Sequence, residues 1–304
     1  MKKIAAFAFA FLLTASLRSV TPEDLALAKS LRGVYRTMPD DNPARYAVDL
    51  ISTQYWHSIA LGRVSGEIPA TEEQLSASRA SLREIRSKLD MGLAWQAKPP
   101  KLTIPRLAKA PSIDGEFAPR EWADAFRFDT MYPIDSTVPA ASVCQWYVAY
   151  DESCLYAAAC FPERPKAVYG YNDPCGKQPW DGDAAEVFIL PDPRLLCYRE
   201  SVFTPAGCAL FTLHTKRMNE IHINCRPESP EKIRCASRTD GDGWTIEIAI
   251  PFSELPGYFR GNPPRSGEEL RFALIRTRDG RQFSVFPLLY GGHNIYGYAK
   301  GILE

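Results

Sequence analysis

Proline is distributed very unevenly along this chain of 304 residues. Residues 1–98 contain four prolines, and residues 99–304 contain the other 21 of the 25. Proline lacks a backbone N–H and clashes with the preceding helical turn, so it is rare inside helices and common in turns. The first part of the chain is therefore predicted to be helical, and the second part to consist of strands joined by turns.

Three segments of the first part carry helix-start signals. Each segment begins with an N-cap residue. This residue is followed directly by a proline, or three positions later by an acidic or amide side chain, or by both. The N-cap residues are Thr21, Asn42 and Thr71. They predict helices over 22–37, 43–61 and 72–91, within a helical segment spanning 20–95.

The N-terminus has the pattern of an export signal. Lys2 and Lys3 precede an apolar run from Ile4 to Ala15, which is shorter than the roughly 20 residues that a membrane-spanning helix needs. We therefore expect residues 1–19 to be a cleaved signal peptide, and the mature protein to be periplasmic or extracellular without membrane insertion. A buried N-terminal helix or an uncleaved anchor is the alternative.

The charge of the chain argues against one class of partner. The sequence has 36 basic (Lys and Arg) and 36 acidic (Asp and Glu) residues, so its formal net charge is zero. Nucleic acid binding depends on a positive field that neutralises phosphates. We therefore do not expect a nucleic acid partner.

A Pro-rich linker, 96–105, leads into a region where apolar residues alternate with a period of two. Segments 142–150 and 155–161 flank a short turn and predict a hairpin, and 221–225 with 232–237 predict another. Short strands with Pro and Gly turns are typical of an antiparallel β-sandwich, here over 101–304. The other predicted strands are 101–105, 184–190, 197–203, 208–215, 244–250, 270–276, 282–286 and 301–303.

All eight cysteines lie between Cys144 and Cys235, in a chain expected to be exported. Disulfides form in that environment, and no Cys-x-x-Cys or zinc-type spacing is present. The hairpins suggest the pairs Cys144–Cys160 and Cys225–Cys235, and less firmly Cys197–Cys208. Buried free thiols are the alternative.

The segment 176–190 (GKQPWDGDAAEVFIL) is the candidate for a binding site. Trp180 precedes a strand in a polar loop, where it is not an obvious core residue. Asp183 follows, and Glu186 lies on an otherwise apolar strand face, so its carboxylate needs hydrogen-bond donors. Sugar hydroxyls can supply them while the indole covers a pyranose face. Alternatively, the two carboxylates accept from backbone amides and hold the loop.

A series of motifs over residues 101–304 resembles the family 9 carbohydrate-binding modules and their larger relatives. The motifs occur in order: "IDG…W" in 111–125; "YD…LY" in 148–161; "PW…D…E.F" at Pro179, Trp180, Asp183, Glu186 and Phe188; "P.G" at Pro205 and Gly207; "GW..E.AIPFSEL" in 243–255; "G…RF…R" in 267–276; and "H….YG" at His293, Tyr296 and Gly297.

This resemblance implies a β-sandwich that holds a sugar end between two aromatic rings. The motifs place Trp180 as one ring and Tyr290 as the other, with Tyr290 standing where a Trp is expected. Glu186 matches a carboxylate that binds hydroxyls, and Asp183 belongs to the same segment. The family's sugar-binding arginine and asparagine have no clear match in 197–207, since Arg199 is out of step. The family often holds structural calcium, for which the Asp240–Trp244 segment is a candidate, although such a segment also makes a plain hairpin turn.

We therefore expect an exported, non-catalytic protein that binds a polysaccharide or oligosaccharide and supports its capture or breakdown. The sequence leaves open whether a separate hydrolase works beside it. A structural or surface protein with a degenerate sugar site is the main alternative. A glycoside hydrolase would use Asp181, Asp183 and Glu186, but these acids lie too close in sequence to flank a bond. A haem-binding domain of the DOMON type would draw on Met131, Met218, His214, His222 and His293.

Overall fold

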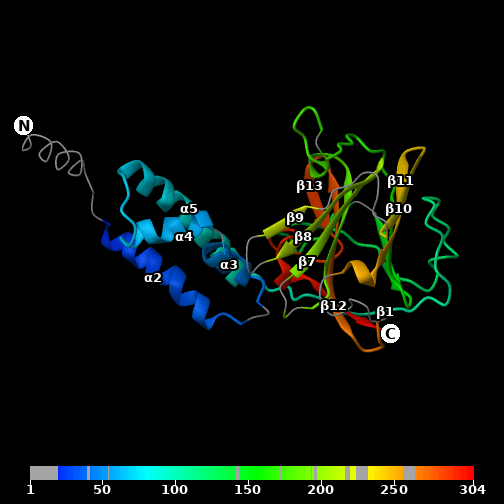
Figure 1. Cartoon of the computed structure of the whole chain (residues 1–304), viewed down its shortest axis with the longest axis horizontal. Coiled ribbons are helices and arrows are strands. Elements are labelled where there is room, and N and C mark those ends of the chain that lie inside the picture. Colours follow the sequence, from blue (N-terminus) through cyan, green and yellow to red (C-terminus); the bar gives the residue numbers. More distant parts are fainter. Residues whose placement is uncertain are drawn as a thin grey trace, which may run out of the picture. The chain divides into compact units, whose positions relative to one another are not determined.

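The chain divides into two compact units, Met1–Gln96 and Ala97–Glu304 (Figure 1). The structure, a computed structural model, describes residues 20–39, 42–53, 55–141, 144–171, 173–192, 194, 197–215, 220–223, 232–255 and 264–304. The predicted signal peptide lies outside these residues. Among the described residues, no helix has both the length and the apolarity needed to cross a membrane.

The first unit is helical, with α2 (Pro22–Thr37), α3 (Arg45–Thr53), α4 (Tyr55–Val64) and α5 (Glu72–Ala94). The predicted capping boxes are confirmed: the Thr21 side chain accepts from the backbone of Asp24, and that of Thr71 from Gln74. Leu31 and Leu82 are fully buried in this unit. Arg79 of α5 binds the carboxylate of Asp24 at 2.7 Å and lowers its pKa to about 2, which ties α5 to the first turn of α2.

The second unit is a sandwich of two sheets, as predicted (Figure 1). Among the described residues, the nine-stranded sheet has the order β1-β14-β12-β6-β7-β8-β9, with β13 on β12 and β3 on β13; the five-stranded sheet has the order β10-β11-β5-β4-β2. The strands of the larger sheet are β1 (Lys101–Ile104), β3 (Tyr132–Pro133), β6 (Ala184–Leu190), β7 (Cys197–Thr204), β8 (Gly207–Thr215), β9 (Glu220–Ile223), β12 (Glu269–Arg278), β13 (Arg281–Ser284) and β14 (Ala299–Leu303). Those of the smaller sheet are β2 (Phe126–Phe128), β4 (Gln145–Tyr150), β5 (Cys154–Phe161), β10 (Arg234–Asp240) and β11 (Gly243–Pro251).

Aromatic and cationic contacts identify the inner face of the larger sheet. Phe272 of β12 meets Phe128 of β2 with ring centroids 6.4 Å apart, and Arg276 lies 5.0 Å from the ring centroid of Phe161 on β5. Successive side chains of a strand point to opposite faces. Ile275, which pairs with Glu186 of β6, therefore faces away from the smaller sheet, and so does Glu186.

One predicted hairpin is wrong. Among the described residues of these two segments, β9 pairs with β8 in the larger sheet, whereas β10 pairs with β11 in the smaller one. Short β2 and β3 lacked enough alternating residues to be predicted. The pairing of β1 with β14 is parallel, which the expectation of an antiparallel sandwich did not include.

These registers remove the basis for the predicted disulfides. Gln145, not Cys144, lies opposite Cys160, and both cysteines are free thiols. Cys197 pairs with Thr215 and Cys208 with Phe203, so those two cysteines lie at opposite ends of their hairpin. Cys225 lies outside the described residues, and β9 and β10 belong to different sheets.

The "IDG…W" segment is held against the smaller sheet by a buried carboxylate. Glu247 of β11 accepts from the backbone N–H groups of Asp114 and Gly115 at 3.2 and 3.0 Å, and from the indole Nε1–H of Trp122 at 3.0 Å. Gly115 has φ of +83°, and a Cβ there would lie 3.0 Å from the backbone of Ser237. Both the glycine and the tryptophan of this motif therefore have structural roles.

Candidate functional site

Trp180 lies on a short 3₁₀ turn, η1 (Pro179–Asp181), directly before β6. Its ring is half-buried and packs with Tyr171 against Ala184, Val202 and Leu210 on the outer face of the larger sheet. The expectation that Trp180 is separate from the core was therefore wrong: the local chain reversal lays the indole on an apolar patch that is not visible in the loop sequence. The packing fixes the ring position before any ligand binds.

An open cleft of about 640 Å³ lies beside this ring. It is lined by Trp180 and Asp181 from η1, by Pro133 and Ile134 from the β3 segment, and by Arg281 and Gln282 from β13. This volume is within the range of small-molecule sites, roughly 300–1,000 Å³. An aromatic wall with several polar groups suits a ligand that has both apolar and hydroxyl-bearing surface.

Glu186 of β6 is buried with 2 % of its surface exposed. Its Oε1 accepts from the Thr277 hydroxyl on β12 and from Nε2 of Gln282 at 3.3 Å. Burial raises the pKa of Glu186 to about 7, and the negative charge of Glu200 adds to this, while the hydrogen bond from Thr277 opposes it. The carboxyl group thus changes charge near neutral pH and relies on side chains for its donors.

Gln282 connects the buried carboxylate to the cleft. Its amide reaches Glu186 while the residue lines the cleft, and its backbone C=O accepts from the N–H of Ile134. Sequence reasoning placed Gln282 in a strand and gave it no role. The only signal was a polar residue in an otherwise apolar strand pattern, which is equally typical of a solvated edge.

Tyr290 is half-buried and lies on the loop after β13. Its φ is +64°, a left-handed conformation that is uncommon for residues other than glycine, and its N–H donates to Oδ1 of Asp135 at 2.6 Å. The adjacent Gly291 lies against Gln282, since a Cβ there would be 3.3 Å from Oε1 of that side chain. The structure therefore brings the backbone at Tyr290 beside the residue that links Glu186 to the cleft. The opposed-ring role predicted for Tyr290 stays a prediction.

Asp183 has the geometry of a loop anchor. Its Oδ2 accepts from the backbone N–H groups of Lys166 and Ala167 at 2.8 and 3.1 Å, and its own N–H donates to the C=O of Ala167. The residue is fully buried. A Cβ on Gly182 would lie 2.5 Å from the same carbonyl oxygen, so the two segments are in close contact. This geometry matches the alternative in which the Asp183 carboxylate accepts from backbone amides and holds the loop.

The remaining predicted site is the calcium candidate at Asp240–Trp244. Asp240 pairs with Gly243 across the tight turn that joins β10 to β11, and Gly241 has φ of +57°. The segment therefore makes a hairpin turn. Calcium binding there stays a prediction.

Comparisons with known proteins support the fold. No protein-family model and no curated protein matches the chain. Among solved structures, the chain is similar to a "putative carbohydrate-binding protein" from Bacteroides uniformis, with TM-score 0.50 and 14% identity over 68% of this chain and 100% of that one.

Two structures of a family 9 carbohydrate-binding module from Caldicellulosiruptor kristjanssonii also resemble the chain. The module bound to cellotriose has TM-score 0.47, 13% identity and coverage of 67% of this chain and 93% of that one. The module bound to glucose has TM-score 0.46, 13% identity and coverage of 67% and 96%. The predicted β-sandwich is confirmed by the two sheets of this structure and by its likeness to the Bacteroides uniformis protein.

Proposed function

We propose that the cleft beside Trp180 binds a saccharide, and that the protein is an exported, non-catalytic carbohydrate-binding protein. The observation that carries this proposal is the indole that is already packed in place at the wall of an open cleft, beside a buried carboxylate. The proposed ligand is a polysaccharide or oligosaccharide, and the proposed role is its capture or support of its breakdown.

The ring of Trp180 supplies the apolar contact. Covering one pyranose face with an indole removes about 100 Å² from water, which contributes about 2.5 kcal/mol at ~25 cal/mol/Å². Loss of translational and rotational freedom opposes this gain. We therefore expect weak binding, with a Kd of roughly 1 mM for a monosaccharide. Because the ring also packs on Ala184, Val202 and Leu210, only part of its surface is free for this contact.

Glu186 and Gln282 supply orientation. Gln282 lines the cleft and offers an amide N–H or C=O to a hydroxyl when it turns away from Glu186. The carboxyl group of Glu186 then accepts from a ligand hydroxyl in place of the amide. A ligand that leaves these polar groups unmatched loses about 1–3 kcal/mol of affinity, so this pair selects among sugars.

The geometry of the acids supports a non-catalytic role. A glycosidase needs two carboxyl groups on opposite sides of the scissile bond, roughly 5–9.5 Å apart. Oδ2 of Asp183 accepts from backbone amides, and Oδ2 of Asp181 accepts from the N–H of Gln178 at the start of η1. Two of the three acids that a hydrolase would use therefore hold the loop.

The proposal is tested by replacing Trp180 in the full chain and comparing it with Trp56→Ala. Trp56 is 75% exposed on α4 in the other unit, so it is a matched control for the loss of an indole. The wild type is first screened on a glycan array, with glucose and cellotriose as soluble probes in calorimetry. We expect Trp180→Ala to weaken binding at least tenfold and Trp56→Ala to leave it unchanged.

Because Trp180 is packed, Trp180→Ala is also expected to be less stable than the wild type. The stability of the variant is therefore measured together with its sugar binding. Losing half-buried contacts should lower the free energy of unfolding by about 1–2 kcal/mol, since full burial of a Trp is worth roughly 3–5. Binding is therefore measured well below the melting temperature of the variant. Unchanged sugar affinity in folded Trp180→Ala, or no glycan bound by the wild type, contradicts the proposal and favours a structural protein.

A further inference from the structure

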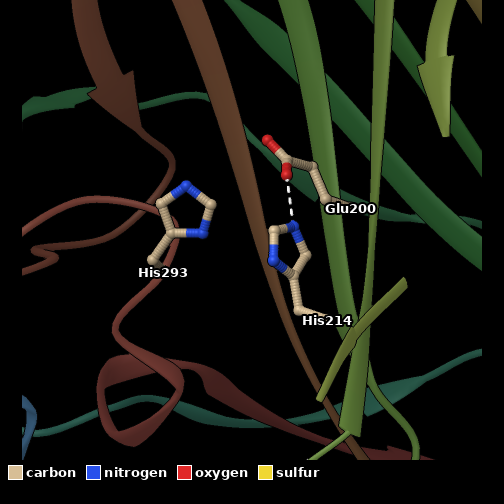
Figure 2. Close-up of side chains that lie close together, drawn as sticks. All are labelled: Glu200, His214 and His293. Carbon is tan, nitrogen blue, oxygen red and sulfur yellow. Dashed lines mark hydrogen bonds and ion pairs between the residues drawn. The ribbon is translucent and has the colours of Figure 1, made fainter. Parts of the chain in front are cut away.

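Three side chains with metal-binding atoms converge on the outer face of the larger sheet (Figure 2). They are Glu200 on β7, His214 on β8 and His293 on the loop before η3 (Ile295–Gly297). Each residue offers one ligand atom, and these three atoms all lie within 4.8 Å of one another. Nε2 of His214 is 2.6 Å from Oε2 of Glu200, and His293 lies across from this pair.

Strand register places the first two residues. Tyr198 pairs with His214, and Glu200 pairs with Thr212, so Glu200 and His214 are diagonal neighbours on one face. The ring of Tyr198 stacks on that of His214 at 4.5 Å with 6° between the planes. Glu200 and His214 are therefore held by regular sheet geometry and by an aromatic neighbour, and neither depends on a loop.

Close packing places the third residue. A Cβ on Gly292 would lie 2.3 Å from the ring of Phe188, so only glycine lets this loop pass over β6. Asn294, two residues after Gly292, is fully buried and donates from Nδ2 to the C=O of Leu289. His293 lies between these two fixed points, and its side chain is exposed.

Tyr198 also orients the exposed ring. Its hydroxyl lies 2.9 Å from Nδ1 of His293. Histidines that bind metals usually have their other ring nitrogen held by an oxygen partner, which fixes the ring and its tautomer. One tyrosine thus positions both histidines, one by stacking and the other by a hydrogen bond.

We propose that Glu200, His214 and His293 form a site for a divalent transition-metal ion of the zinc type, with further coordination positions open to solvent. Two imidazoles and one carboxylate are a ligand set that Zn²⁺ and similar ions accept. Bond lengths of about 2.0–2.2 Å place ligand atoms roughly 3.4 Å apart in a tetrahedral site. Rotation of the exposed His293 closes the present separation, while His214 and Glu200 move apart slightly.

Metal binding replaces the hydrogen bond between His214 and Glu200. In a neutral imidazole the single ring proton moves from Nε2 to Nδ1, so no net proton is released, and the lone pairs of Nε2 and Oε2 then face the ion. Without metal binding, the three residues are a polar network that only stabilises the fold. A metal site and a structural network differ in the stoichiometry of Zn²⁺ binding and in the effect of His293→Ala on that binding. The exposed His293 side chain adds little to stability.

The test is calorimetric titration of ZnCl₂ into the full chain after treatment with a chelator. The expected result is one Zn²⁺ bound per chain. His214→Ala and His293→Ala should each weaken binding by a factor of about 100 or more, because loss of even an outer-shell partner costs 10–100-fold. His57→Ala, in the other unit, removes a histidine without touching the cluster and should bind as the wild type does.

Cobalt absorption identifies the ligands independently of affinity. Co²⁺ bound by nitrogen and oxygen gives visible d–d bands without a thiolate charge-transfer band. A thiolate band would assign the metal to the cysteines and overturn the proposal. It is equally overturned when His214→Ala and His293→Ala bind Zn²⁺ as tightly as the His57→Ala control, or when the wild type binds none.

Discussion

Glu186 and Glu247 are both carboxylates in the middle of strands, one in each sheet, yet their surroundings differ in kind. Glu247 accepts from two backbone amides and an indole, all of which are fixed by the chain. Glu186 accepts from a hydroxyl and an amide side chain, and the amide lines an open cleft. Burial raises the pKa of both groups.

This difference separates a carboxylate that holds the fold from one suited to exchange partners. Fixed donors cannot turn to another acceptor, so the network around Glu247 serves one conformation. Side-chain donors can be replaced by ligand hydroxyls at little cost in backbone order. Burial alone does not distinguish the two, because both side chains are inaccessible.

The largest expected effect comes from removing Glu247. Glu247→Ala leaves three donors without their acceptor, each at a cost of roughly 1–3 kcal/mol, so the free energy of unfolding should fall by at least about 3 kcal/mol. Chemical denaturation of the variant and of Glu186→Ala measures the difference. Because Glu186 has movable partners, Glu186→Ala should be less destabilising than Glu247→Ala. Equal losses of unfolding free energy in the two variants would contradict the distinction between fixed and movable hydrogen-bond donors.

The next effect is a dependence of stability on pH that comes from Glu186. Its pKa is about 7 in the folded protein against an ordinary 4.5, so between these values the folded state holds a proton that the unfolded state has lost. Stability from this group is complete below about pH 4.5 and is lost as the pH rises to 7, by about 3 kcal/mol in all. Thermal melts of wild type and Glu186→Gln over this range should diverge, with the wild type losing stability relative to the variant. Parallel curves would show that the pKa is not raised.

The smallest effect concerns Gln282. Gln282→Leu removes one hydrogen-bonding group, so sugar affinity should fall about three- to tenfold, corresponding to ~0.5–1.5 kcal/mol. The free energy of unfolding should change by less than this, because the bonds from Nε2 to Glu186 are long, at 3.3 and 3.5 Å. Calorimetry with the best glycan from the array measures the affinity. A loss of stability without loss of affinity would place Gln282 with the structural network.

Local patterns in the sequence predicted most of the fold. The capping residues Thr21 and Thr71 start helices because their partners lie three residues away, within the same turn. Alternation predicted the strands for the same reason. The pairing of β9 and β10 with different neighbours was missed, because adjacency in sequence says nothing about which sheet a strand joins.

The site was harder to predict, since its parts come from distant segments. Trp180 and Glu186 were named from one motif, but the packing of Trp180 depends on β7 and β8. Gln282 lies 96 positions from Glu186, and no local pattern links them. His214 occurs in an ordinary strand pattern, and His293 was named as part of the closing motif. The register of β7 with β8 and the glycine at 292 bring them together.

The pairing of β14 also has a consequence for the order in which the sandwich assembles. β14 lies between β1 and β12, and β1 has no other sheet partner among the described strands. The ribosome makes β1 about 200 residues before β14, at roughly 5–20 residues per second. For that interval of some ten seconds or more, the first strand of the sandwich has nothing to pair with. β1 can therefore join the larger sheet only after β14 has been made, when the other strands of that sheet already exist.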